Sequence, residues 1–240
     1  MGIQKQPRSD TKTRILDAAE RLFALRGFQR TSIKRLACEA EVNLAAVNYH
    51  FGSKAALAER VIERRLRPIN RQRMERLEAV QQDAARQGCR PLAEDVLRAF
   101  IEPAFAPTEI MQSERYFLAI AGQVFSGPND TIRSLFIRHF TPPFLLLFQL
   151  MKAALSGLPE GVLWWRLHFV IGALVHCMHM FGTRLPAPNF FPLPDNADTV
   201  VKLLIPFVTN GMKAPYHREN KKMLGLGSQI IQPLTAKGEL

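Results

Sequence analysis

Apolar residues recur every three to four positions along most of the chain, a spacing that predicts helices rather than strands. In the first predicted helix, Thr11–Arg26, this spacing puts Ile15 and Leu22 on one face, between a cap at Asp10 and a stop at Gly27. We therefore expect an all-α protein. The second predicted helix is short and capped by Thr31, and the third spans 44–50. A long helix is predicted from Lys54 into the eighties with a bend near Pro68, and the helix at 131–155 is predicted to kink at Pro142 and Pro143. The other predicted helices span 91–104, 109–125, 162–182 and 197–212, and a loop is predicted at 186–194.

Charge divides the chain into two parts. Of the 32 Lys and Arg and the 21 Asp and Glu, residues 1–90 hold 19 and 10, whereas residues 91–213 hold nine of each. A strongly basic module favours an anionic partner such as nucleic acid, a membrane surface or a phosphorylated ligand. The hydrophobic fraction of 47% is typical of a packed globular protein. The division predicts one module that meets a polyanion and a neutral, apolar body with a different role.

The expected location is a reducing cytoplasm. Cys38, Cys89 and Cys177 are too widely spaced for a disulfide framework or a thiolate zinc site, and the chain start lacks the apolar stretch of a signal peptide. Residues 162–181 are long and apolar enough to raise the question of a membrane span. Because Arg166 and three histidines interrupt this stretch, and charge is costly in lipid, we expect a buried helix and no membrane partner.

Three short helices within residues 11–50, the last two joined by a tight turn at 41–43, are typical of a helix-turn-helix. Val42, Val47 and Phe51 would hold the third helix on the other two. An α-helix fits the major groove of DNA, where Asn48 can pair with adenine. The groove-facing candidates are Leu44, Ala45, Asn48 and Tyr49, and the candidates that reach phosphates are Thr31, Ser32, Lys34, Arg35, Tyr49, His50 and Lys54.

The same residues carry a family resemblance. The segments TSIKRLA at 31–37 and YHFGSK at 49–54 resemble the TetR family of transcriptional regulators, and ILDAAE at 15–20 fits the first helix of that family. Residues 42–54 are similar to the PsrA-type branch, whose repressors respond to long-chain fatty acids, with weaker similarity at 165–169 and 205–207. Many family members carry a glycine where this chain has Glu41, and an aromatic residue where it has Asn48.

The resemblance implies a homodimer whose DNA-binding domain spans 10–55 and whose helical ligand-binding and dimerisation domain spans 56–213. A disordered segment at 1–9 and a flexible tail at 214–240 flank them. It implies a repressor that binds a pseudo-palindromic operator in double-stranded DNA. An apolar or amphipathic inducer, a long-chain fatty acid or acyl-coenzyme A thioester, would release it. We expect no enzymatic activity and no cofactor.

The inducer would bind in the body, which is rich in aromatic and methionine side chains. Core packing is the commoner role for any one of them, but together they could line an elongated apolar pocket. The candidates that line the pocket are Phe117, Phe140, Phe144, Trp165 and Phe169, and the candidate anchors for a carboxylate or thioester head are Arg115, Arg166, His168 and Arg184.

Other interpretations of these residues remain. His168, His176 and His179 share a predicted helix without a carboxylate at metal-ligand spacing, so we expect core or interface histidines and no metal. The arginines between 64 and 76 have glutamates nearby, and we expect them to form a solvated face; direct contact with DNA is the alternative. Helices 162–182 and 197–212 are expected to form the dimer contact. The alternative function is a basic lipid-binding or membrane-surface carrier without specific DNA readout.

Overall fold

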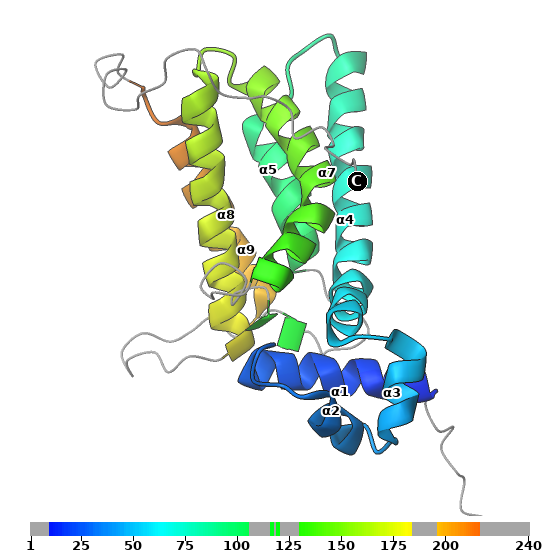
Figure 1. Cartoon of the computed structure of the whole chain (residues 1–240). Coiled ribbons are helices and arrows are strands. Elements are labelled where there is room, and N and C mark those ends of the chain that lie inside the picture. The colour runs from blue at the N-terminus through cyan, green and yellow to red at the C-terminus, as the bar shows by residue number, and fades with distance from the viewer. Residues whose placement is uncertain (1–9, 106–115, 118, 121–129, 184–195, 217–240) are drawn as a thin grey trace, which may run out of the picture.

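The computed structural model describes residues 10–105, 116–117, 119–120, 130–183 and 196–216, which contain helices and no strand. A small unit of three helices sits at one end of a larger bundle (Figure 1). The expected all-α fold is confirmed. The helices are α1 (Thr11–Arg26), α2 (Ile33–Glu39), α3 (Leu44–Phe51), α4 (Lys54–Arg86), α5 (Ala93–Ile101), the 3-10 helix η1 (Glu102–Ala104), α7 (Asp130–Ala154), α8 (Glu160–Thr183) and α9 (Ala197–Lys213).

Local side-chain caps set the starts of the short helices. The side-chain oxygens of Ser32, Asn43 and Ser53 accept hydrogen bonds from the backbone N–H three residues ahead, at 3.2, 2.7 and 3.1 Å. The prediction that Thr31 caps α2 is wrong, because its neighbour Ser32 takes that place. Gly52 ends α3 with a φ of 70°, a conformation that side chains disfavour and glycine adopts freely.

α4 is one helix that crosses from the small unit into the bundle. Leu57, Val61, Ile62 and Leu77 are among its buried residues, and the helix contacts α1 as well as α5 and α7 of the bundle. Pro68 lies inside the helix, and the ribbon changes direction in its lower part (Figure 1). The helix therefore continues through Pro68 without a break.

The bundle is built by α4, α5, α7, α8 and α9, which share one apolar core. α7 and α5 pack on α4, and α9 packs on both α5 and α8. The helix predicted at 131–155 is confirmed as α7, and it runs without a break through Pro142 and Pro143. Most of the helix predicted at 109–125, the loop at 186–194, the segment 1–9 and nearly all of 214–240 lie outside the described residues.

α8 is buried on one face only. Leu163, Leu167 and Leu174 are buried, whereas Trp165 and Phe169 are 49% and 68% exposed. The expectation of a buried helix is thus half right: a single chain leaves the aromatic face uncovered. Within the described residues, α8 has the one stretch, Glu160–Met178, whose length and hydropathy would suffice to span a membrane. Such a stretch is weak evidence, since core helices meet the same criteria.

Candidate nucleic-acid interface

The third helix of the small unit is held by its apolar side and exposes the other. Val47 and Phe51 are 1% and 8% exposed and join a core that includes Leu36 of α2 and Ile15 of α1. Tyr49 is 87% exposed, and the other groove-facing candidates predicted for α3 also reach solvent. The sequence therefore predicted correctly which side of α3 is free. The exposed candidates are Leu44, Ala45, Asn48, Tyr49 and His50.

The turn before α3 is strained and held from a distance. Glu41 has a φ of 50°, a backbone conformation that favours glycine over residues with a side chain. Nη2 of Arg14 donates hydrogen bonds of 2.6 Å to the carbonyl oxygens of both Ala40 and Glu41. Arg14 on α1 thus fixes the turn that sets the angle between α2 and α3. No pattern in the sequence indicated this role.

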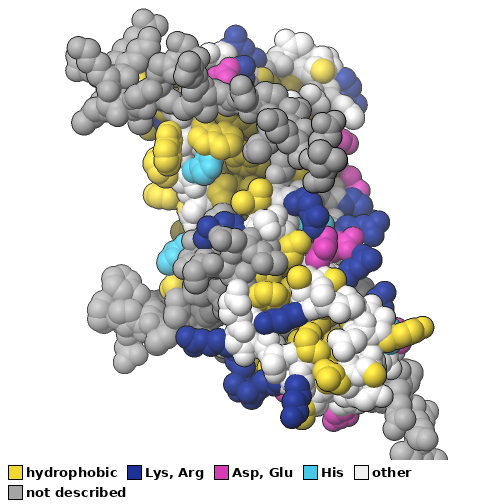
Figure 2. Space-filling view, viewed as in Figure 1, with side chains coloured by type: hydrophobic (Ala, Val, Ile, Leu, Met, Phe, Trp, Pro, Cys, Tyr) yellow, Lys and Arg dark blue, Asp and Glu magenta, His cyan; other side chains and the backbone are white. Residues whose placement is uncertain are grey.

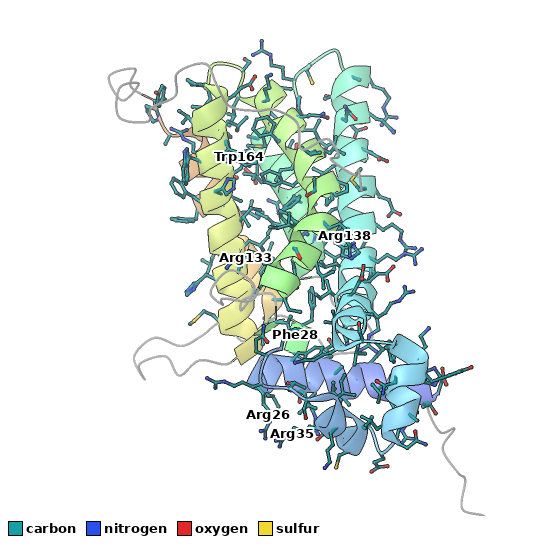
Figure 3. The ribbon with its side chains drawn as sticks, in the orientation of Figure 1. Arg26, Phe28, Arg35, Arg133, Arg138 and Trp164 are labelled. Carbon is teal, nitrogen blue, oxygen red and sulfur yellow. The ribbon has the colours of Figure 1, made fainter. Side chains whose placement is uncertain are left out.

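Basic side chains surround this end of the molecule (Figure 2). Lys34 and Arg35 on α2 are exposed, and Arg26 and Arg35 lie at the end away from the bundle (Figure 3). Ser32 is exposed, with its hydroxyl oxygen accepting the bond from the N–H of Arg35 at 3.2 Å. The helices that carry these side chains and the exposed face, α2 and α3, pack directly on each other.

Thr31 departs from its predicted place on this surface. It is 1% exposed, and its hydroxyl donates to the carbonyl of Gly27 at 2.9 Å. Its backbone N–H donates to the carbonyl of Phe28. The prediction that Thr31 reaches a phosphate is therefore wrong, because both of its donors face the protein.

Lys54 is tied to the loop between α1 and α2. Its Nζ donates to the carbonyl of Gln29 at 3.4 Å and lies 4.3 Å from the centre of the Phe28 ring. Partial burial lowers the pKa of Lys54 from its usual value. The ammonium group lies in the first turn of α4. Its contacts with Gln29 and Phe28 restrain it more than a lysine that extends freely into solvent.

The small unit is joined to the bundle by a buried ionic cluster. Glu20 of α1 is 1% exposed and accepts from Nε and Nη2 of Arg65 at 2.8 and 3.1 Å. Arg64 also donates to Glu20 and, at 2.7 Å, to Asp17. Burial would lower the pKa of Arg64, but hydrogen bonds and charges from Asp17 and Glu20 raise it overall. The expected solvated face is wrong for these two arginines, which pair with α1.

Further along α4 the arginines differ from one another. Arg71 faces Glu75 at 3.7 Å and Arg76 pairs with Glu102 at 2.7 Å, as expected of surface groups. Arg73 is only 3% exposed and lies inside the bundle. Its burial is a second departure from the predicted solvated face.

The predicted ligand residues divide between the interior and the surface. Phe117 stacks with Phe136 at a centroid distance of 6.1 Å, and Phe140 stacks with Phe144 at 5.7 Å, all within the bundle. Arg115 and Arg184 lie outside the described residues. Phe144 continues this aromatic contact to Trp164 of α8, at 5.4 Å (Figure 3).

The other predicted ligand residues lie on other sides of α8. The ring centres of Trp165 and Phe169 lie 6.2 Å apart, and both side chains are exposed. Nη1 of Arg166 donates to the carbonyls of Met212 and Ala214, at 2.7 and 2.8 Å, and so closes the end of α9. The structure therefore does not bring Arg166 to the aromatic interior. His168 is exposed, although its ring contacts that of Phe144 at 6.1 Å.

Comparison with known proteins covers both parts of the chain. The model of bacterial regulatory proteins of the tetR family matches residues 15–61, and a model of the tetracyclin repressor-like C-terminal domain matches residues 98–211. The probable HTH-type transcriptional regulator YttP of Bacillus subtilis (strain 168) is 38% identical over 52 residues. That match spans 22% of this chain and 25% of YttP, so the chain covers a quarter of that relative's length.

Solved structures share the fold at low identity. The fatty acid degradation regulator FadR from Bacillus halodurans has a TM-score of 0.58 at 12% identity, over 83% of this chain and 98% of that one. The TetR family transcriptional regulator PfmR from Thermus thermophilus has a TM-score of 0.53 at 17% identity, over 85% and 100% of the two chains. The two family models cover the helix-turn-helix and most of the bundle, and the chain belongs to the TetR family of bacterial transcriptional regulators.

Proposed function

We propose that this protein is a repressor that binds a pseudo-palindromic DNA operator as a homodimer and is released by an amphipathic ligand. The observation that carries the proposal is the exposed face of α3, supported from behind by Val47 and Phe51. A membrane-surface carrier would not need a rigid helix that exposes Ala45 and Asn48 beside basic residues. A helix of this kind fits the major groove.

The roles of the surface residues follow from their chemistry. Asn48 reads a base edge, and Leu44 and Ala45 pack against bases at close approach. Tyr49, at the far end of the exposed face, and His50 reach backbone phosphates. Phosphate contacts also come from Ser32, Lys34, Arg35 and, through its position at the start of α4, Lys54.

An apolar stripe across α8 and α9 supports dimerisation. Trp165 and Phe169 of α8 are exposed, as are Leu203 and Phe207 of α9, at 65% and 70%. The two helices pack on each other, and Gly172 on α8 leaves open space where another helix could approach. We propose that a second copy covers this stripe in a four-helix contact. The two copies of α3 would then lie about 34 Å apart, one turn of DNA.

Aromatic side chains within the bundle and at its edge support an apolar ligand. The rings of Phe140, Phe144 and Trp164, the last of which is 40% exposed, contact one another in series across α7 and α8. Together with the PsrA-type resemblance, this favours a long-chain fatty acid or its coenzyme A thioester as inducer. Ligand and DNA binding would be coupled by α4, which contacts both parts of the chain.

Selection of bound sequences from random DNA duplexes tests the DNA-binding proposal. Enrichment of one inverted repeat is expected. Binding that is equally strong for all duplexes and depends only on salt would instead support a non-specific basic surface. Adding fatty acids of increasing length to the complex with the enriched duplex then tests release.

A further inference from the structure

Arg73 is a cation buried in the bundle. It is 3% exposed, and no carboxylate among the described residues forms an ion pair with it. By contrast, the buried Arg65 on the same helix is paired with Glu20 at 2.8 Å. A buried charge that lacks a counter-charge is costly, so its retention requires an explanation.

Neutral groups use only part of the Arg73 guanidinium. Nε donates to the carbonyl of Phe100 at 2.9 Å, in the last turn of α5, and Nη1 donates to Oδ1 of Asn70 at 3.2 Å. A guanidinium has five N–H donors. Within the described part of the chain, Nη2 makes no hydrogen bond, so the paired N–H groups that suit a carboxylate are not fully used.

The surroundings combine a cation with aromatic rings. The guanidinium carbon lies 4.3 Å from the centre of the Phe100 ring and 5.6 Å from that of Phe140. Burial, which disfavours the charged form, lowers the pKa of Arg73 to about 9. Asn70 links this group to α7 by donating to the carbonyl of His139 at 2.7 Å, and Nε2 of His139 is buried without a hydrogen-bond partner among the described residues.

The rings also mark a direction away from Arg73. The distance between ring centres is 5.5 Å for Phe100 and Phe140, 5.7 Å for Phe140 and Phe144, and 5.4 Å for Phe144 and Trp164. This series leads from α5 through α7 to α8. The series has the Arg73 guanidinium at one end and Trp164, which is 40% exposed, at the other.

We propose that Arg73 is the anchor for the anionic head of the ligand, a carboxylate on an apolar chain that lies along Phe100, Phe140 and Phe144. The assignment rests on the proposed ligand-responsive function and replaces Arg166, which is engaged at the end of α9. The carboxylate would accept two N–H bonds from Nη1 and Nη2 and supply a counter-charge that the described residues do not provide. Arg73 lies eight residues beyond Arg65, about 12 Å along α4, so the anchor and the contact with α1 share one helix.

The test compares a carboxylate with its uncharged ester. Tryptophan fluorescence of the full chain without DNA would be titrated with octanoate, dodecanoate and hexadecanoate and with their methyl esters. The wild-type protein should bind at least one acid about tenfold to a hundredfold more tightly than its ester, the range of one charge-assisted pair. Arg73→Gln should remove this preference by weakening only the acid.

Two variants separate binding from folding. Arg73→Lys keeps the charge and a donor for the Phe100 carbonyl but loses the paired N–H groups of the guanidinium. The preference for the acid over the ester should therefore fall several-fold. This variant keeps the test possible if Arg73→Gln does not fold. Arg76→Gln, on the exposed side of α4 beside Glu102, should leave the preference intact. Circular dichroism and thermal unfolding check that each variant is folded.

The outcomes distinguish this inference from the proposed function. Equal binding of acids and esters by the wild type, or a preference that persists in folded Arg73→Gln and Arg73→Lys, overturns the role of Arg73. Failure of all three acids to bind also overturns it, whatever the result of the duplex selection. If an acid binds through Arg73 but does not displace the operator, the anchor stands and the proposed release by this ligand fails.

Discussion

Replacing Glu20 by glutamine should destabilise the protein far more than a surface charge change. The substitution keeps the shape of the side chain but removes the charge that Arg64 and Arg65 share. The side chain of Arg65 is 10% exposed, so it would be left as a buried cation without a partner. Breaking a buried pair costs about 3–5 kcal/mol. Because Arg64 retains Asp17, we expect the lower end, about 3 kcal/mol.

Urea unfolding at fixed protein concentration measures this loss, because the stability of a dimer depends on concentration. The matched control is Glu63→Gln, which breaks the exposed pair with Arg60 and should cost about 0.2–1 kcal/mol. Replacing both Glu20 and Arg65 with apolar residues, Leu and Met, should recover most of the loss. A Glu20→Gln loss no larger than that of the control would refute the reasoning.

Four further substitutions test the proposed DNA surface, the dimer contact and the turn before α3. Asn48→Ala should cost about 1–3 kcal/mol on the selected operator and less on random duplexes, whereas Arg35→Ala should weaken both alike and lower the salt slope by about one unit; equal losses for Asn48→Ala would exclude it as a base reader. If the proposed dimer forms through the apolar stripe, Phe207→Glu should give a monomer in sedimentation at micromolar concentration, since it puts a charge on that stripe, and an unchanged mass would locate the contact elsewhere. Glu41→Gly should raise the free energy of unfolding by about 0.5–1 kcal/mol by relieving the positive φ, and a lower urea midpoint would contradict this.

Local signals in the sequence sufficed for most helix boundaries. Gly52 and Ser53 marked the end of α3 and the start of α4, because a positive φ and a side-chain cap are properties of the residues themselves. Thr31 and Ser32 show the limit of this approach. Both are hydroxyl residues before an apolar pattern, and only the packing of the loop decides which one turns inward.

The spacing of apolar residues in the sequence did not predict contacts between distant segments. Glu20 and Arg65 are 45 positions apart, and neither has an apolar neighbour pattern that indicates burial of its charge. Arg73 lies between the exposed Arg71 and Arg76, and its burial follows from the packing of α5 and α7 on α4. The outward direction of Trp165 was equally hidden, since a fully apolar helix does not indicate which side its neighbours cover.

The position of Pro68 has a mechanical consequence for α4. Because proline has no backbone N–H, the helix lacks the rung that would join residue 68 to the carbonyl of residue 64. The gap falls between Arg65, which grips α1, and Arg73, inside the bundle. If the helix is stiff on both sides of this point, a small displacement of one helical segment tilts the other segment. We therefore expect the angle between the small unit and the bundle to change most easily at this point of α4.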